Sequence, residues 1–142
     1  MLDISFNFIK KIKRNLFPFY KNKELKFVFN KIQEGFSADI ITARFVGGCV
    51  RKYLSNEKID DIDIATVLST DQIKEKFKNT KFKVVETGAK HGTVTLVSNN
   101  YKLELTTLRK DIKTDGRHAE VEYTDNWQQD SERRDFTINA IY

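Results

Sequence analysis

The order of apolar patterns along the chain is the feature that most restricts its fold. Helical and strand patterns alternate from residue 24 to residue 85, and mainly strand patterns follow up to residue 123. This order predicts a mixed sheet with helices beside it, an α/β (α+β) architecture. The predicted strands are 44–46, 61–66, 82–85, 92–97, 101–107 and 119–123. The predicted helices are 24–34, 48–54, 70–78 and a segment from 126 onward, and the polar segment 110–118 is predicted to be a loop.

Length and composition set the class of protein. A chain of 142 residues with 39% hydrophobic and 32% charged residues suits one globular domain. It contains no apolar run long enough to span a bilayer, so we expect no membrane partner. The one cysteine, Cys49, excludes an internal disulfide and a thiolate metal cluster, and favours a reducing compartment.

The positive charge is concentrated at the start of the chain. The net charge is +5, but residues 1–31 carry eight basic and two acidic side chains, which leaves residues 32–142 with a net charge of −1. We therefore divide the chain into a basic, helical N-terminal segment, 1–31, and a globular domain, 32–142. A helix with a solvated basic face is favoured for the segment over a targeting peptide or an arm that contacts nucleic acid.

Two carboxylates in a D-x-D pattern are the first candidate for chemistry. On a strand, the side chains of Asp61 and Asp63 point to the same face, where both can bind a hard cation such as Mg²⁺. Chance alone supplies roughly one such pair in a chain of this composition, so two solvated carboxylates are the simpler interpretation of the pair by itself. Glu104, between two leucines on a predicted strand, is either a third carboxylate at this site or an outward-facing strand position.

Two further groups of residues favour an anion site. Gly47 and Gly48 lie where a strand meets a helix, a geometry that presents free N–H groups to phosphate, and Arg51 follows on the first helical turn. A tight turn is the alternative interpretation. Arg133 and Arg134 are predicted at a helix start beside apolar residues, which is costly unless anions or carboxylates meet them, and an exposed salt-bridged helix end is the alternative.

These groups stand in an order that resembles a known family. Residues 44–142 resemble the head domain of class II tRNA nucleotidyltransferases, the CCA-adding enzymes, and of related bacterial poly(A) polymerases, within the DNA polymerase beta-like nucleotidyltransferase superfamily. The resemblance rests on five ordered segments: RFVGGCVRKYL, DDIDIAT, GAKHGTVTL with LELTTLRKD, DGRHAEVEYT, and RRDFTINAIY. It implies a head domain with a mixed five-stranded sheet flanked by helices.

The resemblance also implies a reaction. The 3′-hydroxyl of tRNA would attack the α-phosphate of CTP or ATP and release pyrophosphate, with two Mg²⁺ ions bound by Asp61, Asp63 and Glu104. The nucleotide-binding residues that it implies are Gly47, Gly48, Arg51, Arg109, Arg133, Arg134, Asp135 and Asn139. Arg109 belongs, with Asp111 and residues 115–118, to a region that positions the substrate in the family.

The sequence departs from the family at two places. Lys52 occupies the position of the Asp that ends the GGxVRD motif, which reverses a charge near the expected phosphate-binding turn. The neck, body and tail that follow the head in the family are not in this chain, so we expect poor base selectivity.

Several alternatives stay open at this stage. They are a poly(A) polymerase, a split CC-adding or A-adding enzyme, a catalytically impaired nucleotide- or RNA-binding module, and a structural domain. We expect a cytoplasmic location, with the mitochondrial matrix as the alternative because residues 1–20 have transit-like character. The sequence leaves the oligomeric state open.

Overall fold

The computed structural model describes residues 22–88, 91–115, 118–134 and 140–142. Three expectations fall outside these ranges: the helical character of the first 21 residues and the nucleotide contacts of Asp135 and Asn139. None of the helices in the described ranges combines the length and the apolar character that crossing a membrane requires.

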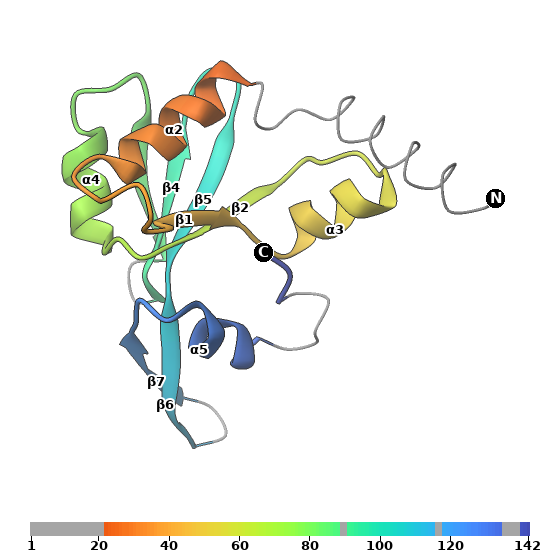
Figure 1. Cartoon of the computed structure of the whole chain (residues 1–142), viewed down its shortest axis with the longest axis vertical. Helices are drawn as coiled ribbons and strands as arrows, with labels where there is room; N and C mark the ends of the chain where they lie inside the picture. The colour runs from red at the N-terminus through yellow and green to blue at the C-terminus, as the bar shows by residue number, and fades with distance from the viewer. Residues whose placement is uncertain (1–21, 89–90, 116–117, 135–139) are drawn as a thin grey trace.

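A five-stranded mixed sheet forms the centre of the molecule, as expected (Figure 1). Its strands are β1 (Ala43–Phe45), β2 (Ile62–Thr66), β3 (Lys83–Gly88), β4 (Thr93–Val97) and β5 (Lys102–Thr107). They lie in the order β1-β2-β5-β4-β3. β2 and β5 pair in parallel, and the other three neighbouring pairs are antiparallel.

One face of the sheet is covered by α2 (Lys23–Gln33) and α4 (Thr70–Phe77), which lie beside each other in Figure 1. Strand side chains alternate between faces, so Ile62 and Ile64 of β2 point to this side with Leu103 and Leu105 of β5. These residues form the main core with the apolar stripes of both helices. The helical residues buried there are Leu25, Val28, Ile32, Ile73 and Phe77.

The opposite face carries the intervening positions, Asp63 and Ala65 of β2 and Glu104 of β5. A smaller apolar cluster of Val46, Ala65 and Leu108 packs here against Trp127 of α5 (Trp127–Glu132). The helix α3 (Gly48–Ser55) follows β1 and contacts β2. The sheet therefore has one continuous apolar face and one face on which polar side chains remain partly accessible.

The helix α2 crosses the expected division between residues 31 and 32. It begins after Asn22, whose side chain accepts hydrogen bonds from the backbone N–H groups of Glu24 and Leu25. Glu24 then accepts hydrogen bonds from Ser98 and Asn100, in the turn between β4 and β5. The part of the basic segment from Lys23 onward is thus a packed helix of the domain.

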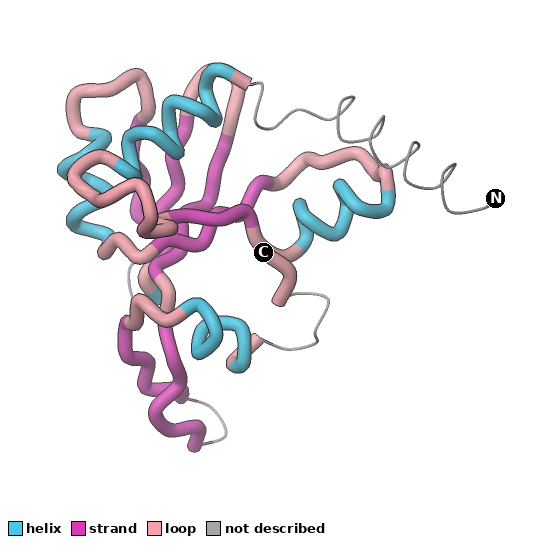
Figure 2. The backbone as a smooth tube through the Cα atoms, in the orientation of Figure 1, coloured by secondary structure: helices cyan, strands magenta, loops and turns pink. Residues whose placement is uncertain are grey.

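The prediction of a loop over 110–118 is wrong. The chain there forms β6 (Arg109–Asp115), which pairs antiparallel with β7 (His118–Tyr123) as a separate two-stranded ribbon, visible below the main sheet in Figure 2. The segment 109–115 reads RKDIKTD, with Ile112 as its one apolar residue, so it lacks the apolar alternation by which the other strands were recognised. Its ladder of backbone hydrogen bonds to β7 is compatible with polar side chains.

Arg133 and Arg134, predicted at a helix start, lie at the end of α5, and residues 135–139 after them are outside the described ranges. The helix α5 begins after Asn126, as expected, but it ends at Glu132, and Arg133 is its C-terminal cap. Cationic side chains are favoured near a helix C-terminus, where the backbone carbonyls carry partial negative charge. The two arginines therefore complete one helix.

Gly47 forms the connection between β1 and α3. Its φ of 69° and ψ of −128° lie in a region that residues with a Cβ atom rarely adopt. Its N–H group donates to the carbonyl of Ile141 at 2.9 Å, which joins this turn to the C-terminal end of the described chain. Gly48 has an ordinary backbone conformation, and a Cβ atom there would lie 3.9 Å from Arg51 Nη2, an ordinary van der Waals distance.

We expect Gly47→Ala to lower the free energy of unfolding by about 1–3 kcal/mol, because the Cβ atom of alanine makes this backbone conformation strained. Gly48→Ala is the matched control, with a free energy of unfolding unchanged or raised by up to about 1 kcal/mol. Urea unfolding followed by circular dichroism measures both. Equal effects of the two substitutions would contradict this assignment of the strained position.

Candidate active site

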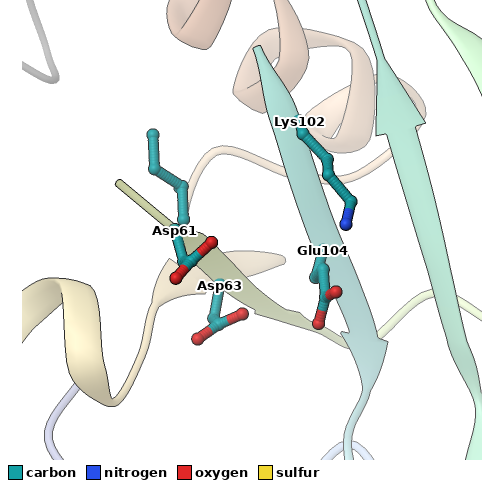
Figure 3. Close-up of a pocket in the computed structure, with 5 residues that line it drawn as sticks. Asp61, Asp63, Lys102 and Glu104 are labelled. Carbon is teal, nitrogen blue, oxygen red and sulfur yellow. The ribbon is translucent and has the colours of Figure 1, made fainter. Parts of the chain in front are cut away.

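Three carboxylates lie together on the partly accessible face of the sheet. Asp63 of β2 and Glu104 of β5 are register partners in the parallel pair, and Asp61 precedes β2 by one residue. All three line one pocket of about 360 Å³, together with Ile62 and Lys102. In Figure 3, Glu104 lies beside Asp63 on the neighbouring strand, and the side chain of Lys102 extends along β5 toward Glu104. The structure thus brings together the three acidic residues that the sequence indicated.

Burial and mutual repulsion act on this group. Asp63 is half-buried, and this burial raises the pKa of its carboxyl, with further increases from the negative charges of Glu104 and Asp61. The positive charge of Arg134 acts in the opposite direction on the same pKa, so this arginine lies within electrostatic reach of Asp63. Concentrated negative charge in a half-buried position favours the binding of a cation.

The carboxylates match a divalent cation in the chemistry of their ligand atoms. Oxygen ligands from carboxylates are those that Mg²⁺ prefers, and a bound cation would relieve the repulsion around Asp63. In the described part of the chain, no three His, Cys, Asp or Glu side chains converge closely enough to enclose a metal ion. The site therefore has the donor types for Mg²⁺ without a closed set of three ligands.

The glycine turn is connected directly to the strand that carries the carboxylates. The N–H group of Val46 donates to the carbonyl of Asp63 at 3.0 Å, and the Cys49 thiol lies 3.6 Å from the same oxygen. Burial raises the pKa of this thiol, which keeps it protonated and unreactive. Gly47 and Gly48 therefore sit at the start of α3 in a fixed relation to Asp63, and the guanidinium of Arg51 lies against Gly48.

Lys52 forms an ion pair at the edge of this site. Its ammonium group contacts the carboxylate of Asp60, next to Asp61 in the sequence. The hydrogen bond to Asp60 raises the pKa of Lys52, and the same bond lowers the pKa of Asp60. The lysine that replaces the family's Asp is thus neutralised locally by a neighbouring carboxylate.

The two arginines at the end of α5 share one buried acid, Asp130, which the sequence analysis did not single out. One carboxylate oxygen of Asp130 accepts hydrogen bonds from Nε and Nη2 of Arg133, and the other accepts them from Nε and Nη2 of Arg134. Asp130 precedes these residues by three and four positions, the spacing at which helical side chains meet. That spacing is the signal by which it could have been found.

Arg109 completes a cationic cluster with these residues. Its backbone N–H donates to Asp130 at 3.0 Å, and its Nη1 donates to the carbonyl of His91 at 2.8 Å. Its buried Nε has no hydrogen-bond partner among the described residues. Burial and the charge of Arg133 lower the pKa of Arg109. Two guanidinium groups contact the carboxylate of Asp130 and that of Arg109 lies within its electrostatic reach, so positive charge is in excess here, as a site for an anion requires.

A family model described as "Poly A polymerase head domain" matches residues 43–142. Among curated proteins, the chain is 40% identical over 127 residues to "CCA tRNA nucleotidyltransferase 1, mitochondrial" of Danio rerio, which covers 86% of this chain and 30% of the relative. It is 48% identical over 100 residues to the protein of the same name from Homo sapiens, a match that covers 70% of this chain and 23% of the relative. It is 45% identical over 101 residues to the "CCA-adding enzyme" of Listeria monocytogenes, covering 70% and 25%.

The solved structures similar to this chain belong to the same family. The CCA-adding enzyme of Bacillus stearothermophilus in complex with CTP matches with a TM-score of 0.62 and 32% identity, over 84% of this chain and 27% of that one. A tRNA nucleotidyltransferase complexed with a primer tRNA and an incoming ATP analog matches with a TM-score of 0.52 and 29% identity, over 70% of this chain and 26% of that one. The chain thus spans about a quarter to a third of the length of these relatives. It belongs to the class II CCA-adding enzyme and poly(A) polymerase family, and it corresponds to the head domain.

Proposed function

We propose that this chain is the catalytic head of a template-independent RNA nucleotidyltransferase that adds CMP and AMP, from CTP and ATP, to the 3′ end of tRNA. The observation that carries the proposal is the pairing of Asp63 with Glu104 across β2 and β5, with Asp61 in the same pocket. The proposed substrates are supported by the relatives named above as CCA-adding enzymes and by the solved relatives with CTP or with tRNA and an ATP analog.

In this proposal the acidic group holds Mg²⁺ through Asp61, Asp63 and Glu104. When bound, the metal would lower the pKa of the attacking RNA hydroxyl and neutralise charge on the triphosphate. The chain itself offers no activated Ser, Cys or His nucleophile at this pocket, since its lining consists of Asp61, Ile62, Asp63, Lys102 and Glu104 within the described residues. Catalysis would consist of positioning and charge neutralisation.

The groups that bind the nucleotide come from both sides of the carboxylates. Gly47 is the N-cap of α3 and donates its own N–H to Ile141, and α3 begins at Gly48, where N–H groups of a helix N-terminus can bind phosphate oxygens. Arg51 and the arginine cluster of residues 109, 133 and 134 provide positive charge, and forked guanidinium groups suit phosphate. Asp135 and Asn139 retain their proposed nucleotide contacts on the strength of the RRDFTINA motif alone.

A poly(A) polymerase is the second candidate, because the matching family model carries that description. The substrate separates the two: a CCA-adding enzyme extends tRNA that lacks its 3′ CCA with both CMP and AMP, whereas a poly(A) polymerase adds AMP to an RNA 3′ end of another sequence. An enzyme that adds only CMP would extend tRNA that lacks the whole CCA end. An enzyme that adds only AMP would extend tRNA that already ends in CC.

For the compartment, we propose the mitochondrial matrix ahead of the cytoplasm. The relatives from Danio rerio, Mus musculus and Homo sapiens are all named mitochondrial, with 40–48% identity to this chain. The transit-like residues 1–20 agree with this order, although they lie outside the described structure.

We expect Asp61→Ala and Asp63→Ala each to reduce nucleotide incorporation by roughly a thousandfold or more, because each removes a ligand worth several kcal/mol of transition-state stabilisation. The assay is incorporation of labelled CTP and ATP, with Mg²⁺, onto tRNA lacking its 3′ CCA, using the longest natural form of the chain. Removing Mg²⁺ with EDTA should abolish the signal of the unsubstituted protein.

Asp71→Ala is the matched control for this assay, because Asp71 is exposed on α4 at the other face of the sheet. It should leave incorporation unchanged. No incorporation by the unsubstituted protein, with nucleotide binding retained, would show a binding module in place of an enzyme. Full activity of Asp63→Ala would show that the metal site has been misassigned.

We expect Lys52→Gln to change incorporation less than threefold and to shift the melting temperature only slightly. The lysine is paired to Asp60 at the surface, and ion pairs in such positions contribute little to stability. Steady-state kinetics with CTP and a thermal melt check both expectations. A loss comparable to that of Asp63→Ala would place the ammonium group of Lys52 in the reaction itself.

A further inference from the structure

Asp130 is the most highly connected buried acid in the described part of the chain. Its side chain has no exposed surface, and its two carboxylate oxygens accept hydrogen bonds from Arg133, Arg134, Tyr142 and the backbone of Arg109. The proposed reaction has no use for this carboxylate as a metal ligand, because the pocket of Asp61, Asp63 and Glu104 does not include it. Its contacts are with the cations around that site.

The arrangement of these contacts sets the orientation of two guanidinium groups. Arg133 and Arg134 each use Nε and Nη2, at distances of 2.7–3.0 Å, on separate oxygens of Asp130. Two hydrogen bonds to a single oxygen hold the Nε/Nη2 edge of each guanidinium toward Asp130. The Nη1 group of each arginine lies outside this contact with Asp130.

Tyr142 provides a second support for Arg134. Its hydroxyl donates to the same oxygen of Asp130 and accepts a hydrogen bond from Arg134 Nε at 3.1 Å. The tyrosine ring packs edge-on against Trp127, with 5.5 Å between ring centroids, so the hydroxyl is itself held in place. The preceding residue, Ile141, accepts the hydrogen bond from Gly47, which connects this support to the glycine turn.

Electrostatics connects the cluster to the carboxylates. Burial alone would raise the pKa of Asp130, but hydrogen bonds from Tyr142, Arg109 and Arg133 hold that pKa below its ordinary value. The acid therefore stays ionised at neutral pH and compensates one of its two arginine partners. The charge of Arg134 also reaches Asp63, as its effect on that carboxyl's pKa indicates. Arg134 thus contacts a buried acid that orients it and lies within electrostatic reach of Asp63.

We propose that Asp130 is a positioning residue that holds Arg134, together with Arg133, in the orientation in which they meet the triphosphate, with Tyr142 as the second support. The proposal rests on the proposed function for the identity of the ligand, a nucleoside triphosphate. It assigns to Asp130 no contact with the nucleotide or the RNA.

The test uses three variants of the full chain, each with a single substitution. Asp130→Asn keeps the size of the side chain and removes its charge. Tyr142→Phe removes only the hydroxyl and keeps the ring packing on Trp127. Asp125→Asn is the matched control, because Asp125 is exposed and lies just before α5.

The first readout needs no nucleotide. In ¹⁵N-edited NMR spectra, the Nε–Hε signals of Arg133 and Arg134 should be protected from exchange with water in the unsubstituted chain and in Asp125→Asn. They should lose at least tenfold in protection in Asp130→Asn, and the signal of Arg134 should lose protection in Tyr142→Phe. Signals that remain protected in both variants would overturn the proposal.

The second readout is the dissociation constant of CTP with Mg²⁺, measured well below each variant's melting temperature. We expect a rise of roughly tenfold or more for Asp130→Asn and about two- to fivefold for Tyr142→Phe, since hydrogen bonds to charged groups set these magnitudes. If Asp130→Asn does not fold, the dissociation constant of Tyr142→Phe decides whether the proposal holds. Reduced melting temperatures with an unchanged dissociation constant would show a purely structural role and overturn the proposal.

The two readouts separate this proposal from the proposed function. An unsubstituted chain that binds no CTP would contradict the proposed function, while the Nε–Hε signals would still decide whether Asp130 holds the arginines. Binding of CTP by the unsubstituted chain, unaffected by Asp130→Asn, would contradict the positioning role alone.

Discussion

The parallel pairing of β2 with β5 is the interaction on which the rest of the structure depends. It joins segments that are forty residues apart and sets Ile62, Asp63 and Ile64 opposite Leu103, Glu104 and Leu105. A shift of one residue in this register would move the apolar side chains out of the core and the acidic ones into it. The same pairing therefore builds the hydrophobic core beneath α2 and α4 and brings two carboxylates together on the other face.

Charge on that second face is separated into an acidic and a basic group. The acidic group lies on the central strands, and the basic group lies on α5 and the start of β6, with Asp130 buried inside it. Arg44 on β1 stacks on Trp127, with 4.7 Å between its guanidinium carbon and the ring centroid, which ties α5 to the edge of the sheet. This separation suits a ligand that carries both a metal ion and phosphate, since each requires the opposite charge.

The sequence predicted the elements whose side chains pack on the core. Residues 61–64 alternate polar and apolar side chains, and Leu25, Val28 and Ile32 form a helical stripe, so both patterns were readable. β6 was missed because its sequence, RKDIKTD, is polar apart from Ile112 and shows no apolar alternation. The D-x-D pair was visible, but apart from the family resemblance its partner Glu104 could not be assigned, because their proximity depends on the register of a long-range strand pairing.

Asp130 was missed for a different reason. A single acid in a polar stretch, WQQDSERR, carries no apolar signal, and its burial results from contacts with Arg109 and Tyr142 that the linear sequence does not show. Its spacing to Arg133 and Arg134, within a helix predicted from residue 126 onward, was the available signal of these contacts. Arg133 and Arg134 were recognised as unusual, but their place at a helix C-terminus follows from the end of α5 at Glu132.

The central claim is that Asp61, Asp63 and Glu104 bind a divalent cation next to the site of the triphosphate. The most direct measurement replaces Mg²⁺ by paramagnetic Mn²⁺, with CTP present, and records which backbone amide NMR signals broaden. The account predicts broadening centred on residues 61–63 and 104, spreading to the glycine turn at residues 47–51. Broadening centred on acidic residues of the opposite face, such as Asp71 and Glu75 on α4, with these signals unaffected, would contradict it.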